Sequence, residues 1–247
     1  ILETECKQVR VTEDNLSAFL GVPRFKNEKM TAVPECGLVN GLAWTQVGGE
    51  LLEVEAMAIP GTGKIELTGN LGDVMRESAR AALTYIRSRA AELGIAEDFY
   101  QKKDIHIHFP EGAVPKDGPS AGIAMATAVI SALTGRPVSR FFAMTGEITL
   151  RGRVLPIGGL KEKTMAAFRA GVNTVLVPED NRPDLTEIDP TVLKNLNFVP
   201  VSHMDQVVDV IFGADLRRQP QNGAAEPLAA PVAIPPQEHP VPACTYR

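Results

Sequence analysis

Two short segments of the chain carry residues that could together do nucleophilic chemistry. In the first, Gly118–Gly122, a serine (Ser120) stands between glycines at the start of an uncharged stretch. In the second, Gly158–Lys163, a pair of glycines is followed by Lys161 and Lys163. A serine hydroxyl is a weak nucleophile until a neighbouring group takes its proton, and a neutral amine is one of the few side chains that can do so. The two segments therefore predict a serine hydrolase whose base is a lysine rather than a histidine.

The surroundings of Ser120 favour its use as a nucleophile. Residues 115–119 have the composition of a loop and residues 121–134 that of a helix, so we expect Ser120 at or near the helix N-terminus. Free N–H groups and the positive end of the helix dipole would then face the carbonyl under attack, as an oxyanion hole requires. The same position also suits a serine that merely caps the helix, and the segment alone leaves this alternative open.

A lysine base requires an unusual environment. The ordinary lysine pKa is about 10.4, so that only roughly 0.1% of the side chain is neutral near pH 7.5. Burial and the N-terminal end of a helix both lower that pKa. Lys161 and Lys163 begin a helix predicted over Lys161–Ala170 and flank its apolar face on opposite sides. The helical pattern does not choose between them, and a solvated first turn remains the alternative.

The composition restricts the class of protein. With 247 residues and 44% hydrophobic content, the chain can bury one substantial core. A net charge of −5 without a basic block gives no electrostatic footprint for nucleic acid. Cys6, Cys36 and Cys244 are odd in number and lack C-x-x-C spacing, which favours a reducing compartment over a disulfide framework or a zinc site. The stretch 118–136, which is uncharged up to Arg136, is rich in Ala, Gly, Ser and Thr, which favours a buried helix over a membrane span.

We expect three regions along the chain. Residues 1–28 are interpreted as a linker arm with a short helix over Asp14–Leu20, residues 29–213 as the folded unit, and residues 214–247 as a disordered tail. The tail holds seven prolines and almost no periodicity, so it cannot bury enough apolar surface to offset its ordering entropy. The chain begins at Ile1 without an initiator methionine, and we expect it to be a piece of a longer polypeptide whose preceding module ends in the arm.

The folded unit mixes strand-like and helix-like segments without strict alternation. An amphipathic helix is predicted over Leu71–Leu93, and Gly48–Gly49 is expected to turn a first hairpin. The other expected elements are strands over Leu38–Val47, Leu51–Ile59, Ile65–Thr68, Ile105–Phe109, Val172–Val177 and Phe198–Ser202, a second hairpin over Phe141–Thr149 and Arg153–Ile157, and a closing helix over Met204–Phe212. This mixture favours an α+β fold over a doubly wound sheet.

Three longer motifs carry a resemblance to a known family. They are, in chain order, Pro115–Gly122, Thr145–Gly152 and Leu155–Lys163, and a fourth segment, Gly41–Thr45, extends the match. Together they closely resemble the proteolytic domain of the ATP-dependent Lon proteases of the soluble A type, over about residues 30–212. The resemblance implies a Lon-type α+β protease domain with a serine–lysine dyad.

The resemblance assigns roles to individual residues. It implies that Ser120 is the nucleophile and Lys163 the base of an acyl-enzyme mechanism. It implies that the hydroxyl of Thr145 helps to orient the lysine, and that Asp117 is a loop acid whose position distinguishes closed from open sites. Without the resemblance these two would be a buried strand residue and an ordinary turn residue. Glu55 aligns with a family glutamate near the site.

Two histidines attract attention as a possible metal pair. His106 and His108 are spaced by two on a predicted strand, so that both point to one face. No third or fourth ligand has suitable spacing, and an edge-strand face near the cleft is the favoured interpretation. In the resembled family this pair lies close to the dyad without being its base. We therefore predict no metal site.

Partners and cofactors also follow from the resemblance. It implies a homohexameric ring that degrades unfolded or misfolded polypeptides fed from a neighbouring ATPase module, in the cytoplasm or the mitochondrial matrix. We expect the substrate to lie extended against a strand edge. Gly61–Lys64 hints at a P-loop, but Ala58 and Ile65 stand where that motif needs Gly and Ser or Thr. No cofactor is expected in this chain, and ATP and Mg are implied only for the missing ATPase module.

Two alternatives remain open at this level. Gly118–Gly122 also fits the G-x-S-x-G elbow of α/β-hydrolases, which would pair Ser120 with a downstream histidine, His203 or His239. That elbow needs a strand that runs directly into the serine, whereas the residues before Ser120 have loop composition. The other alternative is a catalytically silent scaffold or interaction domain, since a fold does not determine a function.

Overall fold

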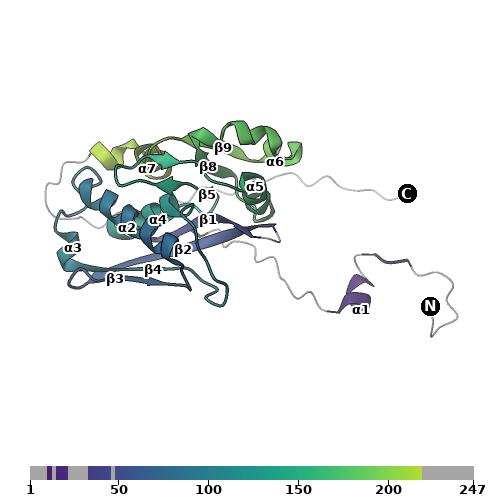
Figure 1. Ribbon diagram of the computed structural model, residues 1–247, viewed down its shortest axis with the longest axis horizontal. Helices are drawn as coiled ribbons and strands as arrows, with labels where there is room; N and C mark the ends of the chain where they lie inside the picture. The colour runs from purple at the N-terminus through teal and green to yellow at the C-terminus, as the bar shows by residue number, and fades with distance from the viewer. Residues whose placement is uncertain (1–9, 13–14, 22–32, 46–47, 219–247) are drawn as a thin grey trace.

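The computed structural model describes residues 10–12, 15–21, 33–45 and 48–218. Most of these residues form a sheet with helices packed on both of its faces (Figure 1). Parallel and antiparallel strand pairs occur in the same sheet, and helices and strands do not alternate strictly. The predicted α+β class is therefore confirmed.

The strands of the main sheet are β1 (Leu38–Thr45), β2 (Gly48–Pro60), β3 (Ile65–Thr68), β4 (Lys103–His108), β5 (Phe142–Met144), β8 (Thr174–Pro178) and β9 (Asn197–Val201). Among the described residues they lie in the order β3-β4-β2-β1-β5-β8-β9. The pairs β1–β2 and β2–β4 are antiparallel, and the other neighbours are parallel. A separate small hairpin pairs β6 (Glu147–Ile148) with β7 (Val154–Leu155).

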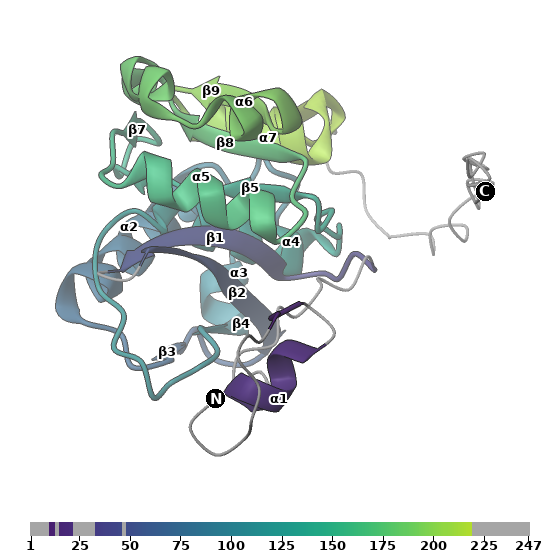
Figure 2. The ribbon, with the colours of Figure 1, turned by 90° about the vertical axis from the view of Figure 1, so that its right-hand side faces the viewer.

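The helices are α1 (Leu16–Leu20), α2 (Asp73–Ser88), α3 (Phe99–Lys102), α4 (Gly122–Thr134), α5 (Leu160–Arg169), α6 (Pro190–Asn195) and α7 (Met204–Phe212). Short 3-10 turns cover η2 (Glu179–Asn181), η3 (Pro183–Glu187) and η4 (Ala214–Arg218). One hydrophobic cluster joins α2, α4 and α7 to one face of the sheet, and a second joins α5 and α6 to the other face. Figure 2 shows α5 lying along β1.

The helix α4 explains the long uncharged stretch of the sequence. Every residue from Gly122 to Ser131 is buried, because the helix is enclosed by the sheet, α2 and α7. A helix that is covered on all sides cannot carry charged residues without a large desolvation cost. The prediction of a buried helix is confirmed. No helix in the described segments combines the length and apolar character needed to cross a membrane.

The first hairpin differs from the prediction in the position of its turn. Gly48 and Gly49 are strand residues that pair with Thr45 and Trp44. Gly49 is needed for close packing rather than for a turn, since a Cβ atom there would lie 2.0 Å from the carbonyl oxygen of Glu162. The β2 strand at Gly49 thus lies directly against the first turn of α5.

The predicted second hairpin is wrong over its first half. Phe142–Met144 pairs in parallel with β1 and β8, and only Glu147–Ile148 forms a hairpin, with Val154–Leu155. The apolar run from Phe141 is therefore divided between two sheets. The interruption falls at Thr145 and Gly146, where the chain leaves the main sheet.

Two other predicted boundaries, the end of α2 and the start of the tail, differ from the structure. The helix α2 ends at Ser88, and the chain to Gly94 continues in turns that still bury Ala90 and Leu93. The short N-terminal helix is present and ends at Gly21, as predicted. The predicted disordered tail begins too early, because η4 places Leu216 in the core with 4% exposure. The rest of the proposed tail and most of the proposed arm lie outside the described residues.

The close approach of α4 to β6 generates a stability prediction. A Cβ atom at Gly122 would lie 2.8 Å from the backbone nitrogen of Ile148, so Gly122→Ala must displace one of these elements. We expect a loss of about 1–3 kcal/mol in the free energy of unfolding, measured by denaturant titration. Gly112→Ala is the control, because nothing lies within 4 Å of its Cβ position. An equal effect of both substitutions would contradict the packing argument.

Candidate active site

Ser120 lies at the junction between the 110–119 loop and α4. The N-cap of α4 is Ala121, so the alternative in which Ser120 merely caps the helix is not supported. The Ser120 carbonyl accepts a hydrogen bond from the N–H of Gly146 at 2.7 Å and one from the hydroxyl of Thr145 at 3.3 Å. These bonds fix the Ser120 backbone against the residues that follow β5.

The donors near Ser120 differ from those expected at a helix N-terminus. The N–H groups of Gly122 and Ile123 donate to the carbonyls of Pro119 and Gly146. Within the part of the chain that the structure describes, the N–H groups of Ser120 and Ala121 have no acceptor. Two adjacent free donors beside the hydroxyl provide what an oxyanion hole needs.

Lys163 is the lysine that the fold places at the site. It lies in the first turn of α5 and is 2% exposed, whereas Lys161 is exposed. Burial lowers the pKa of Lys163 from its ordinary 10.5 to about 8. At this pKa roughly a quarter of the amine is neutral at pH 7.5, which is enough for a general base.

Thr145 connects the lysine to the serine. Its side chain is completely buried, directly after β5. The Lys163 ammonium or amine donates to Thr145 Oγ1 at 3.1 Å, and the same hydroxyl donates to the Ser120 carbonyl. One hydroxyl therefore holds the amine of α5 next to the backbone of the serine. The structure brings these three predicted residues together.

A cleft of about 1300 Å³ surrounds Ser120 and Lys163. Its walls are the outer part of the β1–β2 hairpin, the 110–119 loop and the 156–159 loop. β1 pairs with β5 only at Asn40 and Gly41, so that among the described strands nothing pairs with this edge of β1 at Leu42, Ala43 and Trp44. Ala43 and Trp44 of this edge line the cleft, and Trp44 is 57% exposed.

Asp117 lines the same cleft and holds its loop in place. Its Oδ1 accepts hydrogen bonds from the N–H of Met75 at 3.0 Å and from the N–H of Gly118 at 2.8 Å. Met75 lies in the first turn of α2, where a carboxylate is favoured by the helix dipole. Gly72 allows this contact, because a Cβ atom there would lie 2.3 Å from Asp117 Cγ.

Glu55, His106 and His108 lie away from the cleft, on the outer face of β2 and β4. Both histidine rings are within hydrogen-bond distance of Thr68 Oγ1, at 2.8 and 2.7 Å. β4 lies between β3 and β2, so the predicted edge-strand position of the histidines is wrong. No group of three or more metal-binding side chains occurs in the described segments. The structure does not bring these three residues to Ser120.

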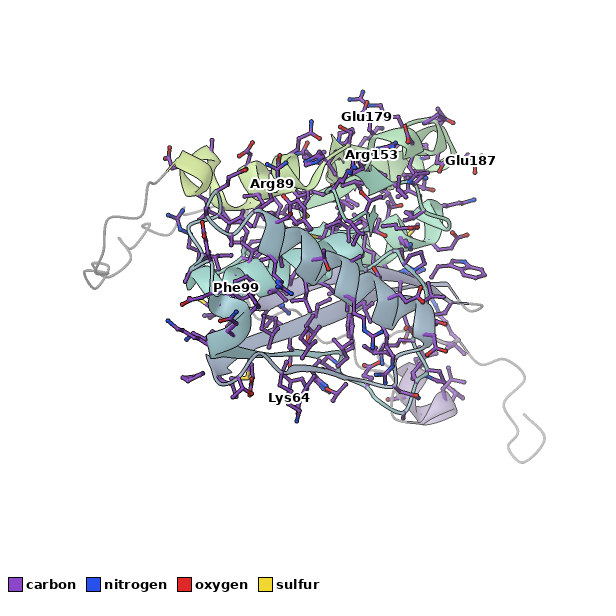
Figure 3. All side chains as sticks on the ribbon, turned by 60° about the vertical axis from the view of Figure 1, so that its left-hand side comes forward. Lys64, Arg89, Phe99, Arg153, Glu179 and Glu187 are labelled. Atoms are coloured by element: carbon purple, nitrogen blue, oxygen red, sulfur yellow. The ribbon has the colours of Figure 1, made fainter. Side chains whose placement is uncertain are left out.

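The residues of the competing motifs have structural partners of their own. Both ring nitrogens of His203 are engaged at the start of α7, one by the N–H of Asp205 at 3.2 Å and the other by the Arg151 carbonyl at 2.8 Å. His239 lies outside the described residues. In the 61–64 turn, the N–H groups of Thr62 and Lys64 donate to Asp104 and are satisfied. Figure 3 shows Lys64 pointing outward at the lower edge of the molecule.

Two buried polar residues around the cleft carry no recognisable signal in the sequence. Arg140 is buried and forms an ion pair with Glu53 in the cleft wall. Asn181 is buried and binds the backbone of Ile157 in the 156–159 loop. Neither belongs to a recognisable catalytic motif, and their partners are distant in the chain, so only an alignment of related sequences could have singled them out.

The buried amine generates a prediction about stability. The pKa of Lys163 is lower in the folded chain than in the unfolded chain. Protonation of the amine therefore destabilises the fold progressively as the pH falls from about 10.5 to about 8, and the full cost remains below that pH. Lys163→Met should stabilise the fold at neutral pH by up to about 3 kcal/mol, and the gain should vanish as the pH rises toward about 10.5. Denaturant titrations at several pH values would measure this, with exposed Lys161→Met as the control. A gain that does not depend on pH would contradict the assignment.

Comparisons with known proteins identify the family of the chain. Residues 10–214 match the family described as the Lon protease (S16) C-terminal proteolytic domain. The chain is 58% identical over 215 residues to a Lon protease of Vibrio parahaemolyticus, which covers 87% of this chain and 28% of that protein. It is 52% identical over 235 residues to a Lon protease of Rhizobium meliloti, covering 95% of this chain and 29% of that protein. The chain thus spans little more than a quarter of these relatives, and it belongs to the family of Lon protease C-terminal proteolytic domains.

Proposed function

We propose that this chain is an endopeptidase domain in which Ser120 is the nucleophile and Lys163 the general base. The observation that carries the proposal is the buried Lys163 amine, which Thr145 holds at 3.1 Å while contacting the backbone of Ser120. An amine with a pKa of about 8 accepts a proton near neutral pH without being permanently charged. Among the described residues that line the cleft, no other lysine is buried.

The mechanism proceeds through an acyl-enzyme. The Lys163 amine takes the proton of the Ser120 hydroxyl while the oxygen attacks the peptide carbonyl, and the resulting oxyanion is bound by the N–H groups of Ser120 and Ala121. The lysine ammonium then gives this proton to the leaving amine, and the C–N bond breaks to leave an ester on Ser120. A water molecule deprotonated by Lys163 hydrolyses the ester and restores both side chains.

The substrate is an extended, unfolded polypeptide segment. The edge of β1 at Leu42, Ala43 and Trp44 offers backbone hydrogen-bonding groups along one wall of the cleft. A peptide that pairs with this edge is held mainly through its own backbone, so its sequence matters little. A stably folded protein cannot present such a segment, because its strands are already paired.

The activity of the complete protein extends beyond this chain. The relatives named above are about three times as long as this chain, and we propose that a preceding ATPase module delivers unfolded substrates to this domain using ATP and Mg. We further propose a homohexameric ring and a role in protein quality control, in the cytoplasm or the mitochondrial matrix. The Thr62 and Lys64 N–H groups bind Asp104, which counts against a nucleotide phosphate site in the 61–64 turn.

The geometry counts against the hydrolase that would use His203. This histidine is held by Asp205 and Arg151 and does not line the cleft. A loop rather than a strand leads into Ser120, unlike the nucleophile elbow. The catalytically silent domain is addressed directly by the experiment below.

Cleavage of a short unstructured peptide by substituted chains tests the assignment. Ser120→Ala and Lys163→Ala should each lower kcat/KM at least about 10³-fold, since each removes a partner of one chemical step. Lys161→Ala and His203→Ala are the matched controls and should retain most of the activity, with thermal unfolding confirming that all variants fold. Activity that survives in Lys163→Ala but disappears in His203→Ala would favour the hydrolase. An inactive, folded and assembled wild type would favour the silent domain.

The pKa of Lys163 sets the expected pH dependence. The base must be neutral, so kcat/KM should rise about tenfold per pH unit on the acid side and level off above about pH 8. Peptide cleavage measured from about pH 6 to about pH 10 gives this profile. A plateau that begins near pH 6.5, the ordinary range of histidine, would exclude lysine as the base.

A further inference from the structure

The 156–159 loop delivers the base lysine to the site. It connects β7 to α5 and lines the cleft, and Lys163 follows one helical turn later. The N-cap of α5 is Gly159, in a left-handed conformation with φ of 70°, and it has no side chain with which to cap the helix. The start of α5 is therefore positioned by its neighbours, which include the β1–β2 hairpin and the partners of the loop.

Asn181 makes such a contact from another part of the chain. Its Oδ1 accepts the N–H of Ile157 at 2.9 Å, and its Nδ2 donates to the carbonyl of the same residue at 2.9 Å. The amide thus pairs with both backbone groups of one residue, as a neighbouring strand would. Nδ2 also donates to Asp184 Oδ2 at 2.6 Å, which fixes the orientation of the amide.

The same segment of chain holds the other partner of the lysine. β8 precedes Asn181 by only a few residues, and the carbonyl of its Leu176 accepts the N–H of Thr145 at 3.1 Å. Residues 174–181 therefore anchor Thr145 at one end and the Lys163 loop at the other. Asn181 is 3% exposed and Leu176 is completely buried, so both of these contacts are shielded from water.

We propose that Asn181 is a positioning residue for catalysis, which sets the place of the Lys163 amine by clamping Ile157 to the segment that also holds Thr145. This inference rests on the proposed function of Lys163 as the base. Asn181 touches no reacting atom and acts only through the loop. An amine that leaves Thr145 also leaves its buried position, and it then meets water and becomes charged at neutral pH.

The consequence is a loss of activity that depends on pH. Asn181→Ala leaves the N–H and carbonyl of Ile157 without partners and releases the loop. Since misplacing a catalytic group by about 1 Å costs on the order of 100-fold in rate, we expect kcat at neutral pH to fall roughly 10- to 100-fold. The loss of kcat should become smaller as the pH rises, because higher pH neutralises the amine even in contact with solvent. The acid limb of the pH profile of kcat should therefore move to higher pH.

The experiment compares this variant with a matched destabilised chain. Val192→Ala removes two methyl groups from the core behind α5, at a residue that is 1% exposed and that makes none of the hydrogen bonds of the loop clamp. It should lower the thermal stability to a similar extent without changing the pH profile of kcat. If Val192→Ala shifts the acid limb as Asn181→Ala does, or if Asn181→Ala leaves the limb unmoved, the proposal is wrong.

A conservative exchange supplies a rescue. Asn181→Asp keeps an acceptor for the Ile157 N–H but places a second carboxylate beside Asp184, so we expect a loss comparable with Asn181→Ala. Adding Asp184→Asn restores one amide and one carboxylate to the pair and should recover part of kcat. Failure of the double variant to exceed Asn181→Asp, at equal folded fraction, would count against the clamp.

A direct titration separates this proposal from the proposed function. NMR of isotope-labelled lysine side chains measures the pKa of Lys163 in the wild type and in Asn181→Ala, whether or not either is active. A pKa that rises toward the ordinary lysine value in Asn181→Ala supports the clamp, and an unchanged pKa overturns it. If the Lys163→Ala variant instead keeps full peptidase activity, the proposed function is wrong, and the result of the titration is unaffected.

Discussion

The contact between the Lys163 amine and the Thr145 hydroxyl is the interaction on which the rest of the site depends. Burying a lysine costs free energy when its amine is charged. Among the described lysines, Lys163 beside Ser120 is the one that the fold buries. What the molecule gains is an amine that is partly neutral near neutral pH. The Thr145 hydroxyl gives the buried amine a hydrogen-bond partner of fixed position, which orients the amine.

The architecture of the sheet explains how that contact arises. α4 and α5 pack on opposite faces of the sheet, and their N-terminal ends meet where β5 stops and β1 continues. The end of β5 leaves room for Thr145 to reach both helices, and the uncovered edge of β1 forms the wall of the cleft. A parallel pair β5–β8 supports this junction from behind, through the bond from Thr145 to Leu176.

Three glycines pack closely against other elements around this junction. Gly49 lies against Glu162, Gly122 against Ile148 and Gly159 against the ring of Trp44. Each allows two elements to approach more closely than a side chain would permit. The glycines of the sequence motifs therefore serve the assembly of the cleft walls as much as the local turns.

Hydrophobic periodicity and the long motifs are local signals. The α+β class, most strands and helices, and the candidates Ser120, Thr145 and Lys163 could therefore be predicted from the sequence. It did not determine the division of the Phe141–Thr149 run between two sheets or the strand role of Gly48–Gly49, since these depend on partners distant in the chain. The choice of Lys163 over Lys161 rested on the family resemblance alone, and its physical reason comes from the tertiary structure. The helical pattern placed both beside the apolar face, and only the packing of α5 on the sheet buries one of them. Burial is a property of the assembled fold, and here it decides which of two lysines can act as a base.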